Sequence, residues 1–235
     1  MTDEKTEELP DLVLGHFTTY RVTPRMWELD PQERKRRALD WVAGLEETAD
    51  NTVLYLTQGI ESEGDVLVWS STRMPEADVP AKYFPVRAAA ENAHRDILER
   101  KHVLWGLTRP SQYSRSAKSA QEIDPFDPER TSYIVMYPFT KTADWYLKSR
   151  DSRQGMMNEH IRIGKQFREI TQLLLYSFGL QDQEFVVVYE TEDLELFSKL
   201  VYDLRDTEAR IYTEGDTPLH TGVLVTPEQW AETLG

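Results

Sequence analysis

The sequence predicts an α+β fold made of two tandem ferredoxin-like repeats that pair as an α/β-barrel. Both halves read as strand, helix, strand, strand, helix, strand. The stretches GDVLVWSSTRMPEAD and QEFVVVYETEDLELF also match, since each has a strand, one or two Ser/Thr residues and the start of a helix. A stretch rich in serine and charged residues, with two prolines, separates the halves. We therefore expect an N-terminal domain at 1–118, a linker at 119–130 and a C-terminal domain at 131–235, packed sheet against sheet.

The first half contains four segments rich in branched apolar or aromatic residues, and these predict strands at 12–20, 52–59, 65–71 and 103–107. Residues 31–45 predict a helix, because Asp30 can cap it, Pro31 suits its first position and apolar residues recur at helical spacing up to Leu45. Residues 77–100 are expected to be mostly helical, with two prolines breaking up the start.

The second half repeats this order, with strands predicted at 133–137, 173–177, 184–190 and 218–225. Pro138 is expected to stop the first of them, because proline cannot donate to a strand ladder. Helices are predicted at 151–168 and 193–204. The turn GLQDQ lies between the two middle strands.

Composition excludes several classes of site. Apolar residues make up 40% of the chain, which indicates a globular protein, and no run of about 18 apolar residues could span a membrane. There is no cysteine, so disulfides, thiolate metal sites and cysteine nucleophiles are excluded. A net charge of −14 disfavours nucleic acid as a partner. The acidic N-terminus lacks the features of a signal peptide, so a cytoplasmic protein is expected.

His160 is the strongest single candidate for chemistry. On a helix it would share one face with Ile163, Phe167 and Leu174. A histidine there can be a core residue bonded to a carbonyl, or it can bind a metal or haem iron. The sequence leaves both interpretations open at this position.

The stretch 133–176 brings other reactive side chains close to His160 and is predicted to form the wall of a buried pocket, with a haem-type cofactor as the best candidate occupant. Tyr137 ends an apolar strand, either as an edge aromatic or as a phenol that can be deprotonated or oxidised. Lys141 is either solvated or able to reach an anionic group such as a propionate, while Trp145 is most simply a core aromatic. A polar group before the linker could bind an anion or be a solvated loop; it comprises Arg109, Tyr113 and Arg115.

These motifs resemble the chlorite dismutase superfamily. The resemblance rests on YPFTK at 137–141, DWYL at 144–147, MMNEH at 156–160 and the later run GLQDQEFVVVYETEDL, and in the first half on LWGLTRPSQY. It implies tandem ferredoxin-like barrels that form homopentamers and bind haem b or coproheme in the C-terminal half. By the same resemblance, His160 matches the iron ligand, Glu208 its carboxylate partner and Trp145 the tryptophan on the same side. Tyr113 and Leu173 would also contact the cofactor.

Within the superfamily the chain resembles the coproheme decarboxylase branch. That branch has a Tyr-Pro-x-x-Lys pattern, which Tyr137 and Lys141 match. Chlorite dismutases place an arginine above the haem about thirteen residues after the iron ligand; here that position is Gln172 or Leu173, and a glutamine suits one group of decarboxylases. The chain differs from the branch at two places. The basic insertion that follows the Tyr-Pro-x-x-Lys pattern in the branch is shortened here to Thr142-Ala143, and the Arg-Tyr-Gly motif of the branch is replaced here by Ile211-Tyr212-Thr213.

The resemblance implies H2O2-dependent decarboxylation of iron-coproporphyrin III to haem b, an enzyme activity in haem biosynthesis. His160 would hold the iron, a radical on Tyr137 would attack a propionate, and Lys141 would position that propionate, with Gln172 over the haem. Two alternatives stay open. One is a chlorite dismutase-like haem oxidoreductase or peroxidase, and the other is a non-catalytic haem-binding protein.

Overall fold

Each half folds in the predicted order in the computed structural model, which describes residues 12–113 and 119–235. The first half contains, in chain order, β1 (Leu12–Val22), α1 (Pro24–Trp27), α2 (Pro31–Glu46), β2 (Asn51–Leu56), β3 (Val66–Met74), α3 (Val79–Asn92) and β4 (Leu98–Thr108). The second half contains β5 (Tyr133–Lys141), α4 (Ala143–Leu147), α5 (Arg150–Gly164), β6 (Thr171–Tyr176), β7 (Phe185–Thr191), α6 (Leu194–Arg205), the 3₁₀ helix η1 (Glu208–Tyr212), β8 (Thr213–Glu214), β9 (His220–Val225) and α7 (Pro227–Thr233).

Eight strands of the described chain close into a ring. The first half has the strand order β4-β1-β3-β2 and the second has β6-β7-β5-β9, which is the ferredoxin-like order in both cases. The halves are hydrogen-bonded at two seams, where β4 pairs with β6 and β2 pairs with β9. The two sheets therefore face each other, as expected, and are also joined at their edges. This confirms the predicted α+β fold of tandem ferredoxin-like repeats, while the domain boundaries stay a prediction.

Glycines lie at both seams, where the strands approach closely. A Cβ on Gly106 of β4 would lie 2.7 Å from the Ser177 hydroxyl oxygen and 2.9 Å from the Tyr176 carbonyl oxygen. A Cβ on Gly222 of β9 would lie 2.7 Å from Cβ of Tyr55 on β2. Both distances are shorter than ordinary contacts, so glycine is the residue that these seams accommodate without a shift.

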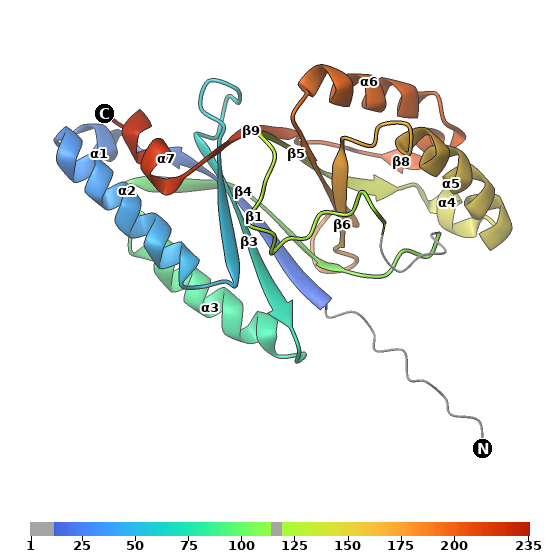
Figure 1. Ribbon diagram of the computed structural model, residues 1–235. Coiled ribbons are helices and arrows are strands. Elements are labelled where there is room, and N and C mark those ends of the chain that lie inside the picture. Colours follow the sequence, from blue (N-terminus) through green and yellow to red (C-terminus); the bar gives the residue numbers. More distant parts are fainter. Residues whose placement is uncertain (1–11, 114–118) are drawn as a thin grey trace.

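Helices cover the outside of the ring on two sides (Figure 1). α2 and α3 lie on the first half and α4, α5 and α6 on the second. The C-terminal helix α7 returns to the first half, where the Trp230 ring lies 5.1 Å from that of Trp41 on α2, measured between centroids. The interior of the ring is an apolar core of Phe17, Tyr55, Leu67, Trp69, Leu104, Ile123, Ile134, Met136, Leu173, Leu175, Val186 and Val188.

Several predicted boundaries are wrong. Pro138 does not stop a strand, because β5 continues to Lys141 and Pro138 lies between the segment paired with β9 and the segment paired with β8. Leu174 is not on the His160 helix, since α5 ends at Gly164 and Leu174 belongs to β6. The helix expected to extend to residue 100 ends as α3 at Asn92, and β4 begins at Leu98.

Arg115 lies outside the described residues. Across residues 12–113 and 119–235, we find no helix with the length and apolar character needed to cross a bilayer.

Candidate functional site

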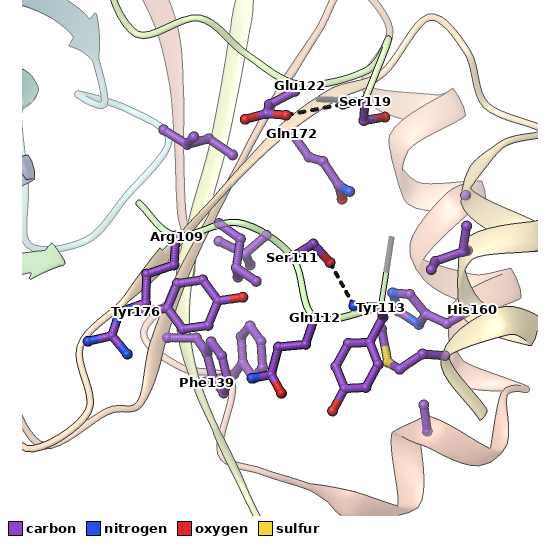
Figure 2. Close-up of a pocket in the computed structure, with 18 of the residues that line it drawn as sticks. Arg109, Ser111, Gln112, Tyr113, Ser119, Glu122, Phe139, His160, Gln172 and Tyr176 are labelled. Atoms are coloured by element: carbon purple, nitrogen blue, oxygen red, sulfur yellow. Dashed lines mark hydrogen bonds between the residues drawn. The ribbon is translucent and has the colours of Figure 1, made fainter. Parts of the chain in front are cut away.

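A large cavity lies mainly in the second half of the chain, between the outer face of β5, β6 and β7 and the helices α5 and α6, and it is also lined by Leu12, Val13 and Arg73 of the first half. Its volume is about 1420 Å³, which exceeds the range of roughly 300–1,000 Å³ typical of small-molecule sites. Segments 108–113 and 119–126 line it as well, so part of the predicted linker forms a wall. Figure 2 shows His160 of α5 and Gln172 and Tyr176 of β6 pointing into this space.

The helix α5 presents one face to the cavity. Ser149 caps its start by accepting a hydrogen bond from the backbone N–H of Ser152. Residues three, four and seven positions apart share a helix face, and the cavity-lining residues of α5 follow this spacing: Arg150, Arg153, Gln154, Met157, Asn158, His160, Ile161 and Gly164. The helix thus directs His160 and several polar side chains to one space.

His160 is half-buried in the cavity wall. Burial, together with the positive charge of Lys141, lowers the pKa of His160 to about 4. The imidazole is therefore unprotonated at neutral pH, which is the state in which it can bind a metal ion.

Glu208, the expected partner of His160, begins η1 and is exposed. Its backbone N–H donates to the Oε2 atom of Glu159, at 3.3 Å, and among the described residues it is not part of the cavity lining. The pairing of the Glu208 carboxylate with His160 stays a prediction.

Lys141 and Trp145 lie together beside the cavity. The Lys141 ammonium donates to the carbonyl oxygen of Ala209 at 3.2 Å and to the Thr213 hydroxyl at 3.0 Å. It also lies 4.8 Å from the centroid of the buried Trp145 ring. Burial and the nearby charge of Arg210 lower the pKa of Lys141 to about 8. The side chain is therefore mostly charged at neutral pH and is held against the cavity wall.

Tyr137 faces the same cavity from β5. Its ring stacks on that of Tyr189 from β7, with 6.1 Å between the centroids. Burial raises the pKa of the Tyr137 phenol, so the group is protonated at neutral pH. A half-buried, protonated phenol in a cavity can donate a hydrogen bond or lose a hydrogen atom.

The β6 strand separates the two candidates for the position over the cofactor. Successive side chains of a strand point to opposite faces. Both residues line the cavity, but Leu173 packs in the core inside the ring, whereas the Gln172 side chain points into the cavity (Figure 2). The Gln172 backbone is held by Gln121 and Ile123, since its N–H donates to the Gln121 carbonyl at 2.8 Å and its carbonyl accepts from Ile123 at 3.0 Å.

Tyr113 and Arg109, from the segment before the predicted linker, also line the cavity (Figure 2). The Tyr113 ring meets Trp145 edge to face, with 6.3 Å between centroids. Its carbonyl accepts a hydrogen bond of 3.1 Å from Gln154 on α5. The Arg109 guanidinium lies 5.6 Å from the centroid of the Tyr176 ring. Arg109 and Tyr113 are therefore part of the cavity wall.

The cavity wall is basic although the chain carries a net charge of −14. Among the described residues that line it, eight are basic and three are acidic. The basic ones are Arg73, Arg109, Lys141, Arg150, Arg153, Lys165, Arg205 and Arg210, and the acidic ones are Glu122, Asp124 and Asp216. Sequence reasoning missed the arginines of α5, although Arg153 stands at helical spacing from His160.

Comparison with known proteins assigns the family. A family model described as chlorite dismutase matches residues 33–225, which is most of the chain. The chain belongs to the chlorite dismutase family. The match spans both repeats and includes all the residues that line the cavity except Leu12 and Val13.

Relatives in this family carry two different enzyme names. Coproheme decarboxylase from Mycolicibacterium smegmatis is 28% identical over 177 residues, covering 74% of this chain and 73% of the relative. Chlorite dismutase from Ideonella dechloratans is 27% identical over 230 residues, covering 93% and 78%. The crystal structure of a mutant chlorite dismutase from Candidatus Nitrospira defluvii superposes with a TM-score of 0.81 at 21% identity, covering 94% of this chain and 95% of that one. This last likeness shows the shared fold.

Proposed function

We propose that this member of the chlorite dismutase family binds an iron porphyrin in the cavity and converts iron-coproporphyrin III to haem b with H2O2. The observation that carries the proposal is one cavity that holds Tyr137, Lys141 and His160 within a basic wall. The name of the relative from Mycolicibacterium smegmatis, coproheme decarboxylase, supports the same choice.

The side chains present fit such a group. An unprotonated imidazole is the common protein ligand of haem iron, and His160 provides one. A porphyrin needs apolar walls, which the cavity offers in Phe139, Met157, Ile161, Leu174 and Val187. Coproporphyrin also carries four propionates, and a basic wall favours the ligand with more carboxylates over haem b.

His160, Lys141 and Tyr137 would have separate roles in the reaction. When bound, the iron porphyrin would supply the oxidising chemistry with peroxide. His160 would hold the iron through its lone pair. Lys141 would hold a propionate close to Tyr137 and balance its charge. Tyr137 would lose one electron and its phenolic proton, and then take a hydrogen atom from the β-carbon of that propionate. Each propionate and one H2O2 would consume one proton and give a vinyl group, CO2 and two waters.

The test is an anaerobic titration of apoprotein with iron-coproporphyrin III, followed by H2O2, with absorbance and product mass as readouts. We expect binding and then stepwise loss of two CO2. Tyr137→Phe should still bind but should lose decarboxylation. Tyr202→Phe is the matched control, because Tyr202 is exposed and lies outside the cavity lining. Full decarboxylation by Tyr137→Phe, or bleaching without CO2 loss in the wild type, would contradict the proposal.

A second candidate is chlorite dismutase-like chemistry on a small oxyanion. It is favoured by the relative from Ideonella dechloratans, whose alignment covers 93% of this chain. Against it, the residues at the position over the cofactor are Gln172 and Leu173, and neither supplies a cation to hold chlorite. Release of O2 from chlorite in proportion to bound haem would support this candidate. Tight porphyrin binding without any turnover would instead indicate a haem-binding protein.

We also propose that the protein acts in the cytoplasm as a homo-oligomer, with a pentamer as the expected form. Two of the most exposed large apolar side chains of the described residues lie on the second half, Leu147 (84% exposed) and Ile211 (72%). Such side chains commonly mark contact surfaces when they gather. Sedimentation equilibrium should give the mass of five chains, and a monomer mass would contradict this.

A further inference from the structure

The basic side chains of the cavity differ in how their charge is satisfied by the protein. Arg205 and Arg210 both form ion pairs with Asp216, at 2.9 and 3.2 Å. The Lys141 ammonium donates to two oxygens. The Arg109 guanidinium lies near an aromatic ring. These four cations therefore have partners in the absence of a ligand.

Arg153 has no such partner. Its side chain is half-buried in the cavity wall, and its Nε atom is buried without an acceptor. Within residues 12–113 and 119–235, no carboxylate or carbonyl oxygen accepts a hydrogen bond from its guanidinium. Leaving a partly buried cation unpaired costs free energy. A protein that keeps one in a cavity therefore provides a place for an anion from outside.

The position of Arg153 suits the edge of a ligand centred on His160. The two residues are seven positions apart on α5, so they share a helix face, and their backbones are about 10 Å apart along the axis. A porphyrin carries its carboxylates at the periphery, several ångströms from the metal. An arginine two turns from the metal ligand thus lies at the level of those carboxylates. The shortened Thr142-Ala143 segment supplies no basic side chain for them.

We propose that Arg153 pairs with a propionate of the bound porphyrin and gives the cavity its preference for porphyrins with free carboxylates, an assignment that rests on the proposed function. Arg153 is a binding residue in this role. Its guanidinium fork matches a carboxylate in two parallel hydrogen bonds.

The experiment compares two ligands on three proteins. Coproporphyrin III and its tetramethyl ester have the same macrocycle, but only the first has free carboxylates. Both are titrated against wild type, Arg153→Gln and Arg162→Gln, following the quenching of tryptophan fluorescence. Arg162 is the matched control, because it lies on the same helix, is exposed and is not part of the cavity lining.

Arg153→Gln should weaken coproporphyrin binding about ten- to a hundredfold, the effect of losing a hydrogen bond to a charged group. It should leave ester binding unchanged, and Arg162→Gln should leave both unchanged. The melting temperature without ligand should stay equal or rise in Arg153→Gln, because an unpaired cation has been removed.

Equal loss of acid and ester binding, or wild-type affinity for the acid, would overturn the assignment. A lowered melting temperature would do the same, since it would indicate a structural role. The binding titration does not depend on turnover. A wild type that binds coproporphyrin but does not decarboxylate the iron complex would therefore overturn the proposed reaction, while the assignment of Arg153 as a propionate-binding residue would stand. Failure of the wild type to bind coproporphyrin would overturn the assignment of Arg153, while the titration with iron-coproporphyrin III tests the proposed reaction separately.

Discussion

His160 should make the stability of the ligand-free protein depend on pH. Its pKa falls from the ordinary value of 6.5 to about 4 in the folded chain and returns to the ordinary value on unfolding. Between these two pH values the unfolded state binds a proton that the folded state does not. The stabilisation is therefore complete above pH 6.5 and is lost as the pH falls toward 4. At about 1.4 kcal/mol per pH unit, the loss is about 3 kcal/mol.

Urea unfolding of wild type and His160→Gln between about pH 7 and pH 4 measures this loss. Gln cannot titrate, so the wild type should lose about 3 kcal/mol more free energy of unfolding than the variant across this range. Burial also lowers the pKa of His16, but that residue is present in both proteins and cancels in the difference. A difference between the two proteins that does not change with pH would refute the reasoning.

Three other predictions concern charge and packing. Coproporphyrin binding should weaken as the pH rises through about 8, because Lys141 then loses its charge, and Lys141→Arg should remove that dependence in the same fluorescence titration. Gly106→Ala should destabilise the protein by about 1–3 kcal/mol in urea because its Cβ meets the neighbouring strand, whereas Gly155→Ala, in open space on α5, should stabilise it by about 0.5–1 kcal/mol. Trp230→Ala should cost about 3–5 kcal/mol, and a loss no larger than that of the exposed Trp27→Ala would contradict the packing of α7.

Most of the fold could be predicted from the sequence, because segments with the apolar pattern of a strand and segments with the apolar spacing of a helix follow one another in the same order in both halves. The start of β4 was missed because Glu99, Arg100 and Lys101 hide the apolar alternation. The helix α7 was missed although Thr226 and Gln229 form a capping box that is visible in the sequence. Its packing on the first half depends on tertiary contacts that no local pattern encodes.

The candidate site was predictable where its residues are close in the chain. Tyr137, Lys141 and His160 come from one continuous stretch, and they line one cavity. The contribution of residues 119–126 was not predictable, because it depends on backbone pairing with β6 between Gln121 and the Gln172 N–H. Nothing in the residue types of that polar segment indicates such a pairing.

The closed ring of strands has a consequence for how a flat ligand reaches the cavity. The wall formed by β5, β6 and β7 is hydrogen-bonded on both sides into the ring, and opening it would break ladders at a seam. The opposite wall is formed by the helices α5 and α6, whereas segment 119–126 is hydrogen-bonded through its backbone to Gln172 of β6. We therefore expect ligand exchange to require displacement of the helical wall while the strands stay fixed. The ring of strands would then stay rigid while the helices move apart and close again over the ligand.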